Sequence, residues 1–148
     1  MSMTNQLPYE TTLHVRDHCL CLAAQRAARA LARRFDEAFR PLGLTSGQFS
    51  LLMSLNRPEP PPMSAVASLL AMDRTTLTAN LKPLQRRGLV EVRPSPADRR
   101  SRLLVLTDEG GALLVRAAPI WEAEHAKIDE SLEACSPDLL REGLSELS

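Results

Sequence analysis

The stretch LLAMDRTTLTANLKPLQRRGLV, residues 69–90, predicts two helices that meet at a tight turn. Asp73 is a good N-cap for the second helix, and Gly88 suits the position just after its end. The apolar face of this helix is formed by Leu77, Leu81 and Leu84. The opposite side, within about 40° on a helical projection, carries Thr75, Ala79, Lys82 and Arg86. A buried face and a polar, basic outer face are typical of a helix-turn-helix.

After Gly88 the apolar pattern changes from a helical to a strand-like period. Residues 89–93 (LVEVR) and 102–106 (RLLVL) are rich in β-formers, and they flank the turn PSPADRRS at 94–101. This arrangement predicts a hairpin whose tip carries basic side chains. A basic hairpin directly after a helix-turn-helix is a wing.

The residues before the helix-turn-helix predict one more helix and a stiff connector. Thr45 and Gln48 match a capping box for a helix over about 45–55. The stretch PEPPP at 58–62 cannot be helical, and we interpret it as a spacer inside the domain rather than a ligand for a signalling domain. Ser64 is then expected to cap the first helix of the helix-turn-helix.

Long helices are predicted at both ends of the chain. Residues 11–42 show one apolar stripe, formed by Leu20, Ala24, Ala27, Leu31, Phe35, Ala38 and Leu42. Thr107 suits the N-cap of a helix that runs toward residue 134, which Pro119 is expected to kink or break. Ser136 and Pro137 suit the N-cap and first position of a last helix through residue 147.

The composition fits one mainly helical domain. The chain has 148 residues, of which 44% are hydrophobic and only 3% aromatic. This excludes a disordered polyelectrolyte and favours helices over a sheet sandwich. No apolar run approaches the roughly 20 residues that span a bilayer, and the start shows no export signal. We therefore expect a cytoplasmic protein without a membrane segment.

The absence of net charge hides a strong division along the chain. Residues 73–102 hold eight basic and three acidic side chains, whereas residues 103–148 hold three basic and ten acidic ones. Thirty consecutive residues with a clear positive excess form a local electrostatic surface suited to a polyanion. A merely solvated basic face is the alternative that charge alone leaves open.

Together these features resemble the MarR family of winged-helix transcription regulators, from about residue 19 to 114. The matching pieces are LGLTSGQFSLL at 42–52, residues 69–90, and ADRRSRLLVLTDEG at 97–110. The resemblance implies a mainly α fold with a small β-hairpin wing. It also implies a homodimer, in which residues 1–44 and 111–148 form a helical dimerisation region and residues 45–110 form a winged helix-turn-helix DNA-binding domain.

The resemblance implies that the second helix and the wing contact DNA. The candidate residues are Arg74, Thr75, Thr76, Thr78, Ala79, Lys82, Arg86, Asp98, Arg99 and Arg100. On the helix, Thr and Ala side chains suit base edges, whereas Lys82 and Arg86 suit phosphates. On the wing, Arg100 is expected in the minor groove, with Asp98 bracing it or the neighbouring backbone. Arg74 is expected to pair with Asp98 or to contact a phosphate.

The cysteines raise the question of the input signal. Cys21 matches the reactive cysteine of the family branch that senses organic hydroperoxides, where two tyrosines bond the sulfur; here Gln25 and Phe35 stand in their places. Cys135 is a candidate resolving partner from a second subunit. Cys19 lies on the same predicted helix but points about 160° away, so a Cys19–Cys21 bridge is not expected. Buried structural cysteines are the alternative interpretation.

Other functions have weaker support in the sequence. His14, His18 and Cys21 share a predicted helix face and suit Zn²⁺, but no acidic or cysteine pair accompanies them, so we expect no metal and no cofactor. A thiol peroxidase built on Cys21 lacks a base and a glycine-rich loop, so an enzyme is not expected. A winged helix used only for protein interaction is opposed by the basic stretch.

The leading interpretation is therefore a homodimeric transcriptional repressor that binds double-stranded DNA. It would bind a pseudo-palindromic operator with half-sites about one helical turn apart. The resemblance implies release by a small phenolic compound or an oxidant at the junction of the dimerisation helices and the winged domain.

Overall fold

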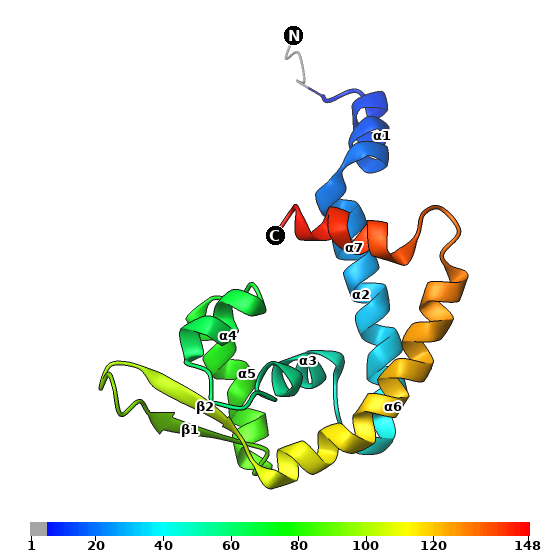
Figure 1. Ribbon diagram of the computed structural model, residues 1–148. Coiled ribbons are helices and arrows are strands. Elements are labelled where there is room, and N and C mark those ends of the chain that lie inside the picture. Colours follow the sequence, from blue (N-terminus) through cyan, green and yellow to red (C-terminus); the bar gives the residue numbers. More distant parts are fainter. Residues whose placement is uncertain (1–5) are drawn as a thin grey trace.

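The computed structural model describes residues 6–148 and confirms a mainly helical fold with one hairpin (Figure 1). In chain order the elements are α1 Tyr9–His18, α2 Leu20–Phe39, the 3₁₀ turn η1 Arg40–Leu42, α3 Ser46–Ser54, α4 Met63–Leu69, α5 Arg74–Arg86, β1 Val90–Pro94, β2 Arg102–Leu106, α6 Asp108–Ser131 and α7 Pro137–Ser145. Residues 1–5 of the predicted dimerisation region lie outside the described part.

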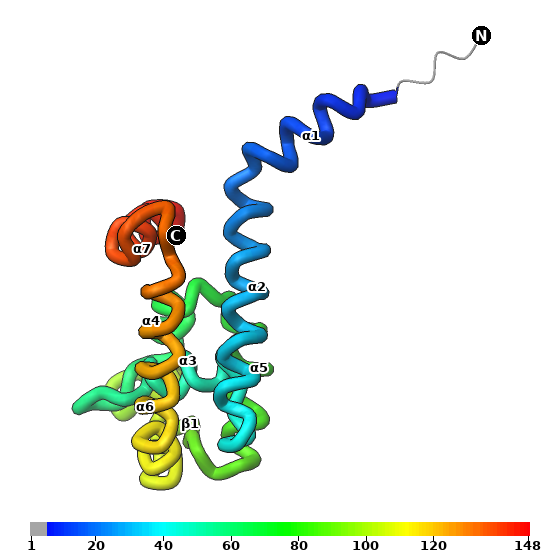
Figure 2. The backbone as a smooth tube through the Cα atoms, turned by 90° about the vertical axis from the view of Figure 1, so that its right-hand side faces the viewer, coloured from blue at the N-terminus to red at the C-terminus, as the bar shows by residue number. Residues whose placement is uncertain are grey.

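The elements form a compact winged domain and a long helical arm, which consists of α1, α2, α6 and α7. Helices α3, α4 and α5 and the hairpin gather on the left of Figure 1, while α2 and α6 stand side by side in both views (Figure 2). Helix α1 continues beyond α2, away from the compact domain. The dimerisation role predicted for residues 1–44 and 111–148 stays a prediction.

One apolar core joins the compact domain to the base of the arm. Leu77, Leu81 and Leu84 of α5 are at most 1% exposed, as the predicted apolar face requires. They belong to the same buried cluster as Phe39 of α2 and Leu104 of β2, both 0% exposed. The helix-turn-helix, the wing and the end of α2 are thus fixed to one another by packing.

Side-chain caps set most of the helix starts. Asp73 Oδ1 accepts from Thr76 N at 2.7 Å, and Thr45 and Gln48 form the predicted capping box. Thr107 caps α6 and Ser136 caps α7. These caps satisfy backbone N–H groups that a first helical turn leaves unpaired.

The hairpin pairs β1 and β2 in an antiparallel register, with Val90 opposite Leu106 and Val92 opposite Leu104. The proline-rich connector lies along the other edge of β2. Leu104 N donates to Pro61 O at 2.9 Å, and Pro62 forms a β-bridge with Leu103. The connector is therefore an integral part of the wing's base.

The structure corrects the predicted helix over 11–42, which is divided at Cys19. This residue has extended backbone angles, φ −77° and ψ 108°. Its N–H closes α1 on Val15 O, and its sulfur accepts from Leu22 N at 3.4 Å as the cap of α2. One residue thus ends one helix and begins the next.

The structure also tests the predicted cap at Ser64 and the predicted kink at Pro119. The predicted cap at Ser64 is wrong, because α4 begins at Met63 and Pro62 occupies the N-cap position. Pro119 does not break α6, which runs on to Ser131. The direction of α6 changes between its yellow and orange parts in Figure 1, consistent with the predicted kink.

The apolar stripe of α2 is buried only near its end. Phe35 and Phe39 are in the core, whereas Leu20 and Leu31 are 67% and 42% exposed. Where α2 meets α6, Arg34 forms an ion pair with Glu124. The hydrogen bond from Arg34 lowers the pKa of Glu124 below its ordinary value.

Candidate DNA-binding surface

Helix α5 presents a polar outer face to solvent. The four residues predicted for this face, Thr75, Ala79, Lys82 and Arg86, are all exposed. The helix begins at the Asp73 cap, where the Thr76 backbone N–H holds the pKa of the carboxyl below its usual value. An exposed helix with a cationic face has the form of the helices that winged-helix proteins place in a major groove.

The threonines on α5 differ in how their hydroxyls are used. Thr76 Oγ1 donates to Asp73 Oδ2 at 3.1 Å, and Thr78 Oγ1 donates to Arg74 O at 2.8 Å. Both hydroxyls are therefore bonded inside the protein, and that of Thr78 also contacts Met63 Sδ of α4 at 4.0 Å. Thr75 lies in a shallow hollow with Thr78, Ala79, Lys82 and Arg74.

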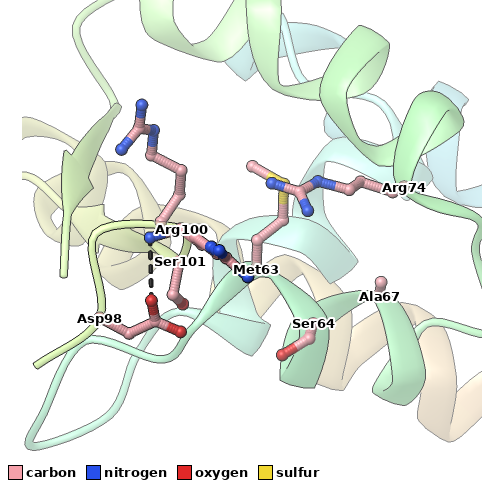
Figure 3. Close-up of a pocket in the computed structure, with 8 residues that line it drawn as sticks. Met63, Ser64, Ala67, Arg74, Asp98, Arg100 and Ser101 are labelled. Atoms are coloured by element: carbon pink, nitrogen blue, oxygen red, sulfur yellow. Dashed lines mark hydrogen bonds between the residues drawn. The ribbon is translucent and has the colours of Figure 1, made fainter.

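The tip of the wing is braced by Asp98. Its carboxylate accepts from Arg100 N at 2.9 Å, and its carbonyl accepts from Ser101 N at 3.0 Å. Asp98 thus braces the neighbouring backbone rather than the Arg100 guanidinium. In Figure 3 the Arg100 side chain points away from Asp98. The turn leaves this cation, and the adjacent exposed Arg99, free to reach a partner.

A cationic hollow of about 470 Å³ joins the helix-turn-helix to the wing. Figure 3 shows its lining, which consists of Met63, Ser64, Ala67, Arg74, Asp98, Arg100, Ser101 and Arg102. Three arginines from α5, the wing tip and β2 therefore surround one cavity. Arg74 and Asp98 form no ion pair in the part of the chain that the structure describes. The predicted pairing of Arg74 with Asp98 is therefore absent, and the other predicted partner, a phosphate, stays a prediction.

Two arginines of the basic stretch have structural partners instead. Arg87 Nη1 donates to Gly43 O at 2.7 Å and Nη2 donates to Leu42 O at 3.3 Å, which ties the end of α5 to the end of η1. Arg93 pairs with Glu91 on the same strand at 2.6 Å. The surface available to a polyanion is therefore narrower than the charge count indicates.

Five of the eight residues that line the cationic hollow are not among the predicted DNA-binding residues. Ser64 and Arg102 both line the cationic hollow. Arg102 belongs to the basic stretch, and its place at the start of β2 beside the tip is the signal that points to it. The N-cap of α4 is Pro62 rather than the predicted Ser64, so Ser64 lies in the first turn of the helix, where its exposed side chain lines the hollow.

The cysteines are free thiols in three different places. Cys21 is exposed and accepts from Gln25 Nε2 at 3.4 Å, Cys19 is half-buried, and Cys135 is exposed near α7. The premise that Cys19 and Cys21 share one helix is wrong, because Cys19 is extended. Phe35, the other predicted neighbour of the sulfur, is in the core.

Within residues 6–148 no group of three or more His, Cys, Asp or Glu side chains is arranged to hold a metal ion. His14 and His18 stack on each other, with ring centroids 4.2 Å apart. Over the same residues no helix is long and apolar enough to cross a membrane.

A second hollow, the junction pocket, lies between α3, α4 and α6 and has a volume of about 460 Å³. It is lined by Phe49, Ser50, Met53, Ser54, Leu69, Ala118, Trp121 and Glu122. The pocket is on the boundary between the winged domain and the arm, and most of its lining is apolar.

A helix-turn-helix, a wing and a cationic hollow between them define a winged-helix DNA-binding protein. The MarR family model matches residues 44–101. The HTH-type transcriptional repressor NicR of Pseudomonas putida is 34% identical over 112 residues, which cover 76% of this chain and 68% of NicR. The chain belongs to the MarR family of transcriptional regulators.

Two further comparisons agree with this assignment. The crystal structure of the M. tuberculosis regulator MosR in complex with DNA is 36% identical, with a TM-score of 0.80 over 88% of this chain and 93% of MosR. The organic hydroperoxide resistance regulator of Bacillus subtilis is 29% identical over 101 residues, 68% of this chain and 69% of that protein. The chain spans 61% of YwoH, another B. subtilis regulator.

Proposed function

We propose that the protein is a homodimeric repressor that binds a pseudo-palindromic operator in double-stranded DNA. The observation that carries this proposal is the cationic hollow, where Arg74 of α5 and Arg100 of the wing meet. One subunit thereby offers a helix for the major groove and a wing arginine for the minor groove, joined by a site for the phosphate between them.

Exposed apolar side chains on the outer helices support a dimer. Val15, Leu20, Leu139 and Leu144 are 54%, 67%, 63% and 47% exposed in the single chain. They lie on α1, α2 and α7, outside the winged domain. An apolar surface of this kind is characteristic of a protein interface, and a second copy of the chain is the partner that the family pattern implies.

The DNA-binding proposal is tested by selecting bound sites from random duplexes and measuring affinity against salt. We expect a two-fold related site and a steep fall of affinity with salt, because several phosphates are neutralised per subunit. Lys82→Ala combined with Arg100→Ala should weaken binding. The charge-matched control Arg40→Ala with Arg116→Ala, on exposed residues of the arm, should not. Salt-independent binding, or full binding by the first variant, would contradict the proposal.

We propose further that a small molecule in the junction pocket regulates DNA binding. The pocket touches α3 and α4 of the winged domain and α6 of the arm. A ligand bound between these elements would change the distance between the two α5 helices of a dimer. It would thereby favour a conformation that does not fit the operator.

An oxidant is the second candidate signal, because Cys21 is exposed and has a side-chain donor in Gln25. The name of the B. subtilis relative, an organic hydroperoxide resistance regulator, agrees with this candidate. Release from DNA by cumene hydroperoxide in the wild type, lost in Cys21→Ser, would support it; equal release in both would exclude Cys21 as the sensor. Cys135→Ser tests the resolving role in the same assay.

A further inference from the structure

The junction pocket has the shape and the lining of a small-molecule site. Its volume of about 460 Å³ falls in the range of roughly 300–1,000 Å³ that is typical of ligand pockets. Three large apolar side chains at its edge, Met53, Leu69 and Trp121, remain 43%, 62% and 38% exposed. An apolar ligand would remove this surface from water.

The polar groups of the junction pocket are mainly acceptors of hydrogen bonds. Glu122 is the one charged residue in its described lining. The Ser54 hydroxyl donates to Leu51 O at 2.6 Å, so only its lone pairs are free for a ligand. Ser50 can donate or accept. A ligand that brings N–H donors is therefore matched, whereas a carboxylate would meet the negative charge of Glu122.

Trp121 adds a second preference for a cation. Its ring lies against His125, with centroids 4.7 Å apart, and His125 in turn lies 6.1 Å from Phe35 of the core. The indole at the pocket wall therefore has one aromatic neighbour, His125, which itself lies against the core. The negative face of an indole attracts an organic cation, and Glu122 is the next residue on the same helix.

We propose that the junction pocket binds an aromatic organic cation, a planar ring that bears a protonated amine. The ring packs between Met53, Leu69 and Trp121, and the ammonium group donates to Glu122. This inference rests on the proposed function, in which a molecule at the junction regulates DNA binding. The proposed ligand is thus a cation, in contrast to the anionic aromatic acids that a carboxylate-binding pocket would select.

The test is direct binding in the absence of DNA. Trp121 is the only tryptophan of the chain, so its fluorescence reports occupancy. The probes are 2-phenylethylamine, neutral 2-phenylethanol and anionic 3-phenylpropionate, which share one ring and a short chain, and calorimetry measures the same series. We expect the amine to bind about tenfold more tightly than the propionate.

Two variants identify the source of this selectivity. Glu122→Gln should remove the preference for the amine, whereas Glu130→Gln, about two turns further along α6 and outside the pocket, should retain it. The proposal is overturned if the amine causes no quenching and no heat, if the propionate binds as well, or if Glu122→Gln leaves the selectivity unchanged. An amine that binds but does not release operator DNA would contradict the regulatory proposal and leave the pocket assignment intact.

Discussion

The contact between α6 and the wing makes a strong prediction about Gly110. A Cβ added at this position would lie 2.3 Å from Leu89 O and 2.7 Å from Leu106 Cδ1. The carbonyl belongs to the backbone and already accepts from Thr107 N at 3.1 Å, so it cannot turn aside. Relief requires α6 to move off the hairpin. Overpacking of this kind costs about 3 kcal/mol, and the better helix propensity of alanine returns about 1 kcal/mol.

Gly110→Ala should therefore lower the free energy of unfolding by about 2 kcal/mol. Gly111 is the matched control, because a Cβ there meets no atom within 4 Å. Gly111→Ala should raise stability by up to about 1 kcal/mol. Urea denaturation at one protein concentration measures both, since the stability of the proposed dimer would depend on concentration. Equal midpoints for the two variants would refute the assigned role of Gly110 at the wing.

Three further predictions concern the cap, the wing and Arg87. Arg87→Ala should lower the free energy of unfolding by about 1 kcal/mol, because it loses its bonds to Leu42 O and Gly43 O. Its DNA affinity should change less than that of Arg100→Ala. A larger loss of DNA affinity in Arg87→Ala than in Arg100→Ala would contradict a structural role. The pKa of Asp73 is lowered by the Thr76 N–H. The ionised Asp73 carboxylate therefore stabilises the fold above the ordinary carboxyl pKa, and this stabilisation is lost as pH falls through the lowered pKa. Asp73→Asn, which retains a cap, should therefore make urea midpoints less dependent on pH between about 6 and 3; an unchanged pH profile would refute this. Arg100→Ala should reduce the slope of log affinity against log salt by about one, as gel-shift titrations can check, and an unchanged slope would argue against a phosphate or minor-groove contact.

Local signals predicted the starts of α3, α5, α6 and α7, but not those of α2 and α4. Asp73, Thr45, Thr107 and Ser136 each accept from a backbone N–H three residues ahead, so the residue type and its spacing contain the whole interaction. Cys19 shows the limit of such signals. Neither glycine nor proline is present there, and a cysteine sulfur is not a common cap, so the apolar pattern continues through a real break between two helices.

Contacts between distant segments could not be predicted in this way. The bonds from Arg87 to the end of η1, and the pairing of Pro61 with β2, depend on how the elements pack. The outer face of α5 was predictable from helical geometry alone, because Leu77, Leu81 and Leu84 define its opposite side. The hydrogen bond of the Thr78 hydroxyl was not predictable from the sequence, because a threonine hydroxyl can bond either to a carbonyl of its own helix or to a partner outside it.

The proline-rich connector also determines how the hairpin behaves toward other molecules. Residues 58–62 include four prolines, none of which has an N–H to offer to an incoming strand. By covering the outer edge of β2, this segment ends the sheet with groups that cannot template further pairing. A small, exposed hairpin that must stay available to DNA is thereby protected, along that edge, from aggregation by strand addition.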